Sequence, residues 1–179
     1  MTSFIQLALL NGANWINDVT GGRRDIKILD VVSKFSCPLV ITHSRGNSLN
    51  MNQLSNYQNV LSDVKCSLDN LVKNALEKNV SEKNIIVDPG IGFSKDIIQN
   101  LEILRNLDVF KKWNLPILIG ASRKRFIGEI LNEKNPKERD IGTLAISCLC
   151  SQFNIDIVRV HNVILNYQIL KVADRIYRK

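Results

Sequence analysis

Five short apolar runs, each followed by a longer segment with helical periodicity, constrain the fold of this chain most strongly. The runs are residues 15–19, 38–42, 84–87, 116–120 and 155–160. They are continuous and rich in β-branched residues, as in strands that are buried on both faces of a parallel sheet. This strand–helix alternation predicts an α/β protein with right-handed crossover connections.

The segments between the runs place apolar residues at the spacing of amphipathic helices. We expect helices over residues 25–35, 57–76 and 97–110, and a last one over 166–177. The buried stripe of the second helix is expected to include Leu76, and that of the third to include Ile98. No Gly-, Ser- or Pro-rich linker interrupts the pattern, so residues 1–179 are predicted to form one domain.

Polar residues at the end of every run favour a barrel over an open sheet. They are Asn17-Asp18, His43-Ser44-Arg45, Asp88, Ser122-Arg123-Lys124 and Arg159 with His161. In a parallel barrel all strand ends converge on one rim, whereas in an open sheet only the strands at the switch point share a site. No GxGxxG follows the first run, which disfavours a dinucleotide-binding fold. The predicted class is α/β, a partial TIM (β/α)₈ barrel of about five parallel strands.

Asp88 begins the segment DPGIGFSK, directly after the third run. Its carboxylate could accept two parallel N–H bonds from the amino edge of a flat heterocycle, and the glycines would let the backbone approach that ring. The alternative is a tight turn that Asp88 caps. On the same rim, Asn17 offers a donor and an acceptor to a heterocycle, whereas Asp18 could equally cap a turn. A lone strand-end histidine such as His43 is more often structural.

Basic residues follow the fourth and fifth runs. Lys124 lies at the start of a helix, where positive charge opposes the helix dipole, so an anionic or electron-rich ligand would compensate. The alternative is a solvated cluster of charges. Arg159 and His161 alternate along a strand end and point the same way, so together they could clamp a diphosphate. The alternative for Arg159 is an ion pair with Asp156 or Asp140.

Composition limits the classes of partner. The net charge of +7 could indicate a polyanion, but the basic residues are scattered and only 6% of residues are aromatic, so we predict no nucleic-acid partner. No apolar run reaches the roughly 18 residues of a membrane span, and the amino-terminal residues lack the features of a secretory signal. The four cysteines form no C-x-x-C pair. We expect a soluble protein in a reducing compartment. This compartment would be the cytoplasm, or the plastid stroma if the protein is organelle-encoded.

Taken together and in order, the strand-end motifs resemble those of the dihydropteroate synthases. The segments that carry the resemblance are Asn17-Asp18, His43 to Gly46, Asp88 to Lys95, Ser122 to Lys124 and Arg159 to His161. The similarity extends over essentially the whole chain. It implies a folate-pathway transferase that condenses 4-aminobenzoate with a hydroxymethyl-dihydropterin diphosphate and releases diphosphate, with Mg²⁺ as the cofactor.

The resemblance also implies roles for individual residues. The pterin ring would be held by Asn17, Asp88 and Lys124. The 4-aminobenzoate would be bordered by Phe93, Ser122 and Lys124. Retention of Lys124 favours a synthase over a related pterin-binding barrel that serves methyl transfer.

The diphosphate would be held by Arg159 and His161, and these two residues with Lys124 are the expected catalytic groups. The chemistry needs no strong protein nucleophile, because the substrate amine attacks a methylene as diphosphate leaves. Catalysis would come from positioning and from stabilising the departing charge. We expect no residue of this chain to be a metal ligand.

Two departures from the family pattern matter. Thr42 and Ser44 stand where the family usually has methionines on either side of the histidine. Met1 falls where the helix after the third family strand begins, so the first three βα units are expected to be missing. Five strands cannot close an eight-stranded barrel, and an open sheet exposes two edges. We therefore expect the chain to be unstable alone, to be completed by an amino-terminal fragment as one half of a split enzyme, to form a homodimer, or to be a truncated, non-catalytic pterin-binding remnant.

Overall fold

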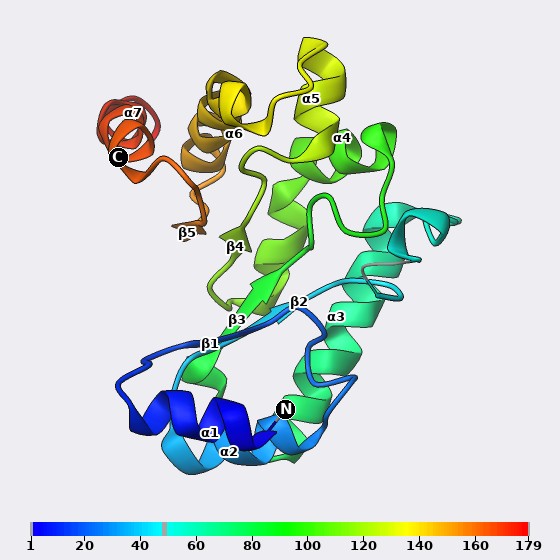
Figure 1. Cartoon of the computed structure of the whole chain (residues 1–179), viewed down its shortest axis with the longest axis vertical. Coiled ribbons are helices and arrows are strands. Elements are labelled where there is room, and N and C mark those ends of the chain that lie inside the picture. Colours follow the sequence, from blue (N-terminus) through cyan, green and yellow to red (C-terminus); the bar gives the residue numbers. More distant parts are fainter. Residues whose placement is uncertain (1, 48–49, 179) are drawn as a thin grey trace.

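The computed structural model describes residues 2–47 and 50–178, in which five parallel strands alternate with helices (Figure 1). The strands are β1 (Ile16–Asp18), β2 (Leu39–Thr42), β3 (Ile85–Asp88), β4 (Leu118–Ile119) and β5 (Ile157–Val158). The helices are α1 (Thr2–Leu10), α2 (Lys27–Phe35), α3 (Val60–Glu77), α4 (Ile97–Arg105), α5 (Arg125–Leu131), α6 (Asp140–Gln152) and α7 (Val163–Tyr177). The predicted α/β fold with five parallel strands is confirmed.

The strands follow one another in chain order. β1 pairs with β2, β2 with β3 and β4 with β5, and a parallel bridge between Val87 and Ile117 connects β3 to the residues just before β4. Within residues 2–47 and 50–178 no pairing joins β5 to β1, so no barrel is closed. Because all strands run the same way, their carboxyl ends lie at one edge of the sheet.

The two faces of the sheet are covered differently. One face packs against the helices in the main hydrophobic core through Leu39, Ile41, Ile85, Val87, Ile117 and Ile119. Among the described residues, the opposite face carries a small apolar cluster, formed by Val40, Ile86 and Leu118 with Ile157 against it. Side chains alternate along a strand, so Thr42 and Asp88, which pair in register, continue this second face toward the carboxyl edge. The thinly covered face therefore ends in polar groups.

The helix predictions need several corrections. The third predicted helix is two elements, because α4 ends at Arg105 and a 3₁₀ segment, Leu107–Trp113, follows it. Ile98 is 73% exposed, since the face of α4 that packs on the core is the one bearing Asn100, Ile103 and Leu104. Leu76 is 43% exposed because it lies in the last turn of α3, at the end of the buried stripe.

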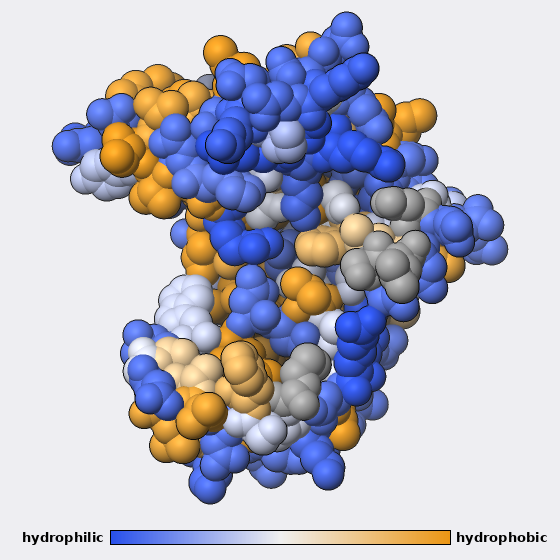
Figure 2. Space-filling view, viewed as in Figure 1, coloured by the Kyte–Doolittle hydropathy of each residue, from blue (hydrophilic) through white to orange (hydrophobic). Residues whose placement is uncertain are grey.

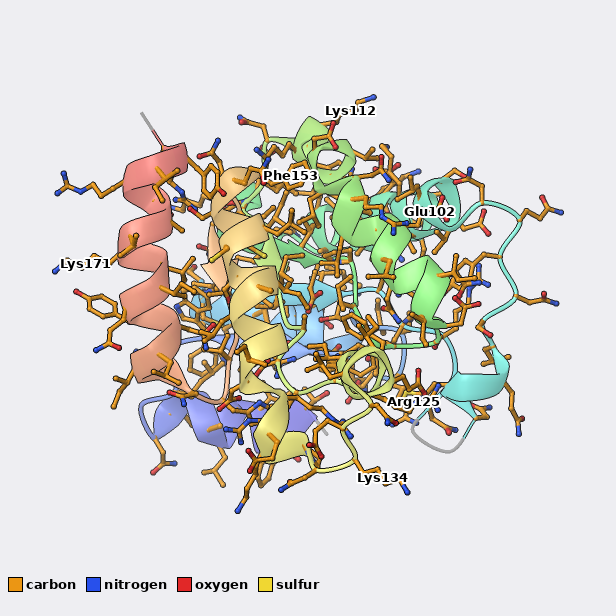
Figure 3. The ribbon with its side chains drawn as sticks, turned by 90° about the horizontal axis from the view of Figure 1, so that it is seen from above. Glu102, Lys112, Arg125, Lys134, Phe153 and Lys171 are labelled. Carbon is orange, nitrogen blue, oxygen red and sulfur yellow. The ribbon has the colours of Figure 1, made fainter. Side chains whose placement is uncertain are left out.

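The helix predicted to start at Lys124 is present as α5, which begins at Arg125, whereas α6 was not predicted. The residues that α6 buries are Thr143, Ser147, Cys150 and Ser151, which are small and mostly polar, so no apolar stripe marks the helix in the sequence. Seen from above, α6 and α7 lie side by side (Figure 3). They are joined by hydrogen bonds from Ser147 Oγ to Asn166 Oδ1 (2.6 Å) and from Ser151 Oγ to Asp174 Oδ1 (2.5 Å).

Both ends of the strand array carry exposed apolar side chains. α7 leaves Ile164, Tyr167 and Ile176 exposed, and α1 leaves Phe4 and Leu10 exposed. Figure 2 shows apolar residues over α1, and the outline of the molecule is hollowed between the regions of α1 and α7. Of the helices in the described part of the chain, none is long and apolar enough to cross a membrane.

Candidate functional site

Asp88 is the last residue of β3 and is 1% exposed. Within the described chain, its carboxylate has one hydrogen bond, which Oδ1 accepts from the backbone N–H of Gly90 at 2.7 Å. Burial raises the pKa of Asp88, and the Gly90 N–H and the positive charges of Lys124, Arg159 and Lys95 partly oppose this rise. The predicted turn cap is therefore present, and the second carboxylate oxygen remains available to a ligand.

Lys124 precedes α5 and lies over the turn that follows Asp88. Its Nζ donates a hydrogen bond to the carbonyl of Ile91 (2.5 Å) and lies 3.8 Å from the centre of the Phe93 ring. Gly92 makes this approach possible, because a Cβ there would lie 2.3 Å from Lys124 Cδ. Burial lowers the pKa of Lys124 to about 8, Asp88 raises it, and Arg159 lowers it further.

Arg159 follows β5 and lies over Gly120, the residue after β4. A Cβ at Gly120 would be 3.0 Å from the Arg159 guanidinium, so a side chain there would displace it. On the same strand end, His161 Nδ1 lies 2.9 Å from Ser122 Oγ, which also accepts the backbone N–H of His161 at 3.2 Å. These contacts hold His161 against Ser122 and leave the Arg159 guanidinium over the end of β4.

A cavity of about 360 Å³ brings these groups together. It is lined by Phe93, Gly120, Ser122, Lys124, Arg159, Val160 and His161. Five of the seven residues predicted from the sequence therefore share one space. Its two cationic side chains suit an anionic ligand, and the flat ring of Phe93 suits a planar one.

The other two predicted residues lie outside the lining of this cavity. Asp88 is buried close to it, within electrostatic range of both Lys124 and Arg159. Asn17 is exposed on β1, which β2 separates from Asp88 in the sheet. The pairing of Asn17 with Val40 places its side chain on the same face as Asp88, nearer the amino end of the strands.

The structure also decides between the alternative roles of Arg159, Arg123 and Asp18. The carboxylate of Asp140 binds Arg123 in a bidentate pair at 2.7 and 2.8 Å, and Asp156 accepts the backbone N–H of Ile117. Arg159 is therefore not paired with either aspartate, and Arg123 is a structural residue. Asp18 caps its own turn as the alternative interpretation predicted, because it accepts the backbone N–H groups of Thr20 and Gly22.

The sequence did not single out Lys95, which lies under the site. Its Nζ contacts His43 Nδ1 (3.0 Å) and the carbonyls of Gly90 (2.9 Å) and Phe93 (3.0 Å). Burial lowers the pKa of Lys95 to about 7, and burial with the nearby charge of Lys95 lowers that of His43 to about 2. His43 is therefore a neutral, structural group. A lysine that ends a turn made of glycines, apolar residues and one serine was the available signal.

A second cavity, of about 260 Å³, lies on the other side of Phe93. It is lined by Val19, Thr20, Arg24, Ser44, Arg45, Gly46, Asn47, Met51 and Phe93. Phe93 lines both cavities and so forms part of the wall between them. No group of three His, Cys, Asp or Glu side chains in the described part of the chain could hold a metal ion.

Comparison with known proteins places this geometry in a family. The family model described as "Pterin binding enzyme" matches residues 2–161. The chain is 40% identical to the dihydropteroate synthase of Synechocystis sp. over 171 residues, which cover 96% of this chain and 59% of that protein. It is 40% identical to the dihydropteroate synthase of Bacillus subtilis, covering 96% of this chain and 58% of that protein. The chain thus spans less than two thirds of these relatives.

Solved structures give the same result for the fold. The dihydropteroate synthase of Thermus thermophilus in complex with 4-aminobenzoate superposes with a TM-score of 0.93 at 31% identity, covering 99% of this chain and 68% of that one. The same enzyme in complex with 6HMPPP gives a TM-score of 0.93 and 70% coverage of that chain. The five-stranded array is therefore part of a fold of the TIM-barrel type, without closure of the barrel.

Proposed function

Because the chain belongs to the pterin-binding enzyme family, we propose that its site serves the dihydropteroate synthase reaction. In that reaction 4-aminobenzoate is joined to a dihydropterin that carries a methylene diphosphate. The observation that carries the proposal is the buried Asp88 carboxylate beside a cavity that contains Lys124 and Arg159. A pterin diphosphate has an amino edge that a carboxylate can bind and an anionic group that two cations can bind. Few other ligands combine the two.

Each group in the site has a proposed partner on the substrates. The free oxygen of Asp88 would accept from the amino edge of the pterin, with Asn17 and Lys124 completing the contacts to the ring. Phe93, Ser122 and Lys124 would border 4-aminobenzoate. Since Lys124 donates to the Ile91 carbonyl in the free protein, this bond would be exchanged for a bond to the ligand.

The reaction forms a C–N bond and breaks a C–O bond at one methylene carbon. The amine of 4-aminobenzoate attacks as the diphosphate leaves, so the protein supplies orientation and charge rather than a nucleophile. Arg159 offers a planar fork of N–H donors to the departing oxygens, and His161, held by Ser122, offers a further donor. Negative charge that develops on the leaving group would thus be met by groups already in place.

We propose that Mg²⁺ acts with the diphosphate, as is typical of the family. The described residues offer no cluster of acidic or imidazole ligands, so they do not fit a metal site made by this chain alone. None of the roles proposed for the side chains of this chain depends on the ion. The proposal treats residues 1–179 as one domain, in keeping with a single family match over 2–161.

A second candidate is a pterin-binding protein without turnover. The observation that favours it is the open sheet, because five strands do not close a barrel of eight. We propose that turnover needs the remaining βα units, from further chain or from a complementing fragment. The exposed apolar side chains of α1 and α7 support contact with such a partner or with a second copy.

Calorimetric titration of the chain with dihydropterin diphosphate and Mg²⁺ tests the proposal. We expect binding by the unchanged chain, and at least a tenfold loss with Asp88→Asn, since one charge-assisted hydrogen bond is worth about 1.5–3 kcal/mol. Asp108→Asn is the matched control, because Asp108 is exposed and lies in the 3₁₀ segment Leu107–Trp113, outside the lining of the cavity. Absence of binding by the unchanged chain would refute the proposal. Binding without product on addition of 4-aminobenzoate would favour the second candidate.

A further inference from the structure

We propose that Lys95 is a positioning residue for Lys124, acting through the turn between β3 and α4. The effect on ligand binding rests on the proposed function, because it assumes that Lys124 contacts the substrates. The structural link between the two lysines does not depend on that assumption. The turn comprises residues 89–95 and carries Phe93, whose ring lies beneath Lys124.

All the hydrogen-bonding capacity of Lys95 is used within the protein. An ammonium group has three N–H donors. The Lys95 ammonium has three acceptors within 3.0 Å, which are the carbonyls of Gly90 and Phe93 and Nδ1 of His43. The side chain is also buried, at 7% exposure. Lys95 therefore has no donor left for a ligand, and any influence it has must pass through its neighbours.

The neighbours of Lys95 are the groups that hold Lys124. The carbonyls of Gly90 and Phe93 bind Lys95, whereas the carbonyl of Ile91, which lies between them in the chain, accepts the Nζ of Lys124. Two lysines thus hold three carbonyls of one turn. Without Lys95 the Phe93 carbonyl would be released and the Gly90 carbonyl would keep only the backbone N–H of Phe93 (3.0 Å), so the Ile91 carbonyl and the Phe93 ring would be less firmly directed toward Lys124.

Other contacts keep the turn folded when Lys95 is removed. Ser94 Oγ donates to the carbonyl of Arg45 (2.6 Å) and accepts its N–H (2.9 Å), which ties the turn to the end of β2. The backbone N–H of Gly92 donates to Asn100 Oδ1 at 2.6 Å. Loss of the Lys95 ammonium should therefore change the direction of carbonyls locally rather than unfold the site.

A purely space-filling role does not account for a lysine here. Burial lowers the pKa of Lys95 to about 7, Asp88 opposes this, and the positive charges of Lys124, Arg45 and Arg23 lower it further. A methionine would fill a similar volume without the desolvation cost of a cation. A lysine nevertheless occupies this position, and its amino group orders two carbonyls. This is the behaviour expected of a positioning group.

Acylation of lysine amines, followed by mass spectrometry, tests the link without any ligand. The unchanged chain, Lys95→Met and Lys134→Met would be treated with an N-hydroxysuccinimide acetate at pH 6.5, below the pKa of Lys95 at about 7, so that its ammonium is present. We expect Lys124 to react about fivefold faster in Lys95→Met, the effect of losing one hydrogen bond. Lys134 and Lys171 project outward (Figure 3), so Lys134→Met serves as the control and the rate at Lys171 should not change. An unchanged rate at Lys124 in folded Lys95→Met would overturn the proposal.

The same variants are then titrated with dihydropterin diphosphate. We expect Lys95→Met to bind about fivefold more weakly and Lys134→Met to bind as the unchanged chain does. Faster acylation of Lys124 with unaltered affinity would overturn the positioning role. Absence of binding by the unchanged chain would instead refute the proposed function, and the acylation rates would still decide the link between the lysines. If Lys95→Met does not fold, Lys95→Gln, which keeps two N–H donors, replaces it.

Discussion

Removal of the Lys95 ammonium should flatten the dependence of stability on pH between pH 7 and 9. Burial lowers the pKa of Lys95 from 10.5 to about 7 in the folded chain. Between these two values the unfolded chain holds a proton that the folded chain has released. The free energy of unfolding therefore rises with pH, by up to about 1.4 kcal/mol per pH unit.

The size of the effect follows from the two lysines of the site. From pH 7 to pH 9, Lys95 contributes a rise of about 2 kcal/mol, and Lys124, with a folded pKa of about 8, contributes about 1 kcal/mol. Above pH 9, Cys150 contributes to the free energy of unfolding with the opposite sign, because burial raises the pKa of its thiol to about 12. The unfolded thiol then loses its proton first, and stability falls as the pH rises further.

Urea denaturation at pH 7, 8 and 9 measures this directly. The unchanged chain should gain about 3 kcal/mol across the range, whereas Lys95→Met should gain about 1 kcal/mol, the part that Lys124 supplies. Lys134→Met is the control, because Lys134 is exposed and should leave the slope unchanged. If Lys95→Met keeps the full rise, the buried ammonium is not its source and the argument from desolvation is wrong.

Three further changes test the packing around the site, each by urea denaturation against the unchanged chain. Gly90→Ala should destabilise the fold by about 2 kcal/mol or more, because the φ of Gly90 is +71° and a Cβ there would lie 1.8 Å from the carbonyl oxygen of His43. A loss under about 0.5 kcal/mol would contradict that close approach. Asn100→Leu should cost about 1–3 kcal/mol because it leaves the partly buried N–H of Gly92 without its acceptor, and a neutral result would show that this bond is dispensable. Leu118→Ala should cost about 2–5 kcal/mol through a cavity on the thinly covered face, and a near-zero cost would mean that this face is not packed.

The strands and the site were predictable from the sequence because both depend on local patterns. The runs of β-branched residues are long enough to mark each strand to within a few residues. The polar residues that end those runs then meet at one edge because the strands are parallel. Lys124, Arg159 and His161 could therefore be placed together from the sequence.

The remaining features depend on contacts that a sequence does not encode locally. Asp140 pairs with Arg123 rather than with Arg159, although both arginines are at similar distances along the chain. The burial of Lys95 depends on acceptors from His43, the residue after β2, and from its own turn, so its role is a tertiary property. Helix α6 escaped prediction because its buried residues are small and polar.

A double-mutant cycle between Asp88 and Arg159 tests most directly whether the strand ends meet around one ligand. The affinity for dihydropterin diphosphate would be measured for the unchanged chain, Asp88→Asn, Arg159→Met and the double variant, and again for the dihydropterin without its diphosphate. We expect Asp88→Asn to weaken the binding of both ligands and Arg159→Met to weaken the binding of the diphosphate alone. The two changes should be coupled by about 0.5 kcal/mol or more. Equal losses for both ligands with Arg159→Met, or strict additivity of the two changes, would contradict this expectation.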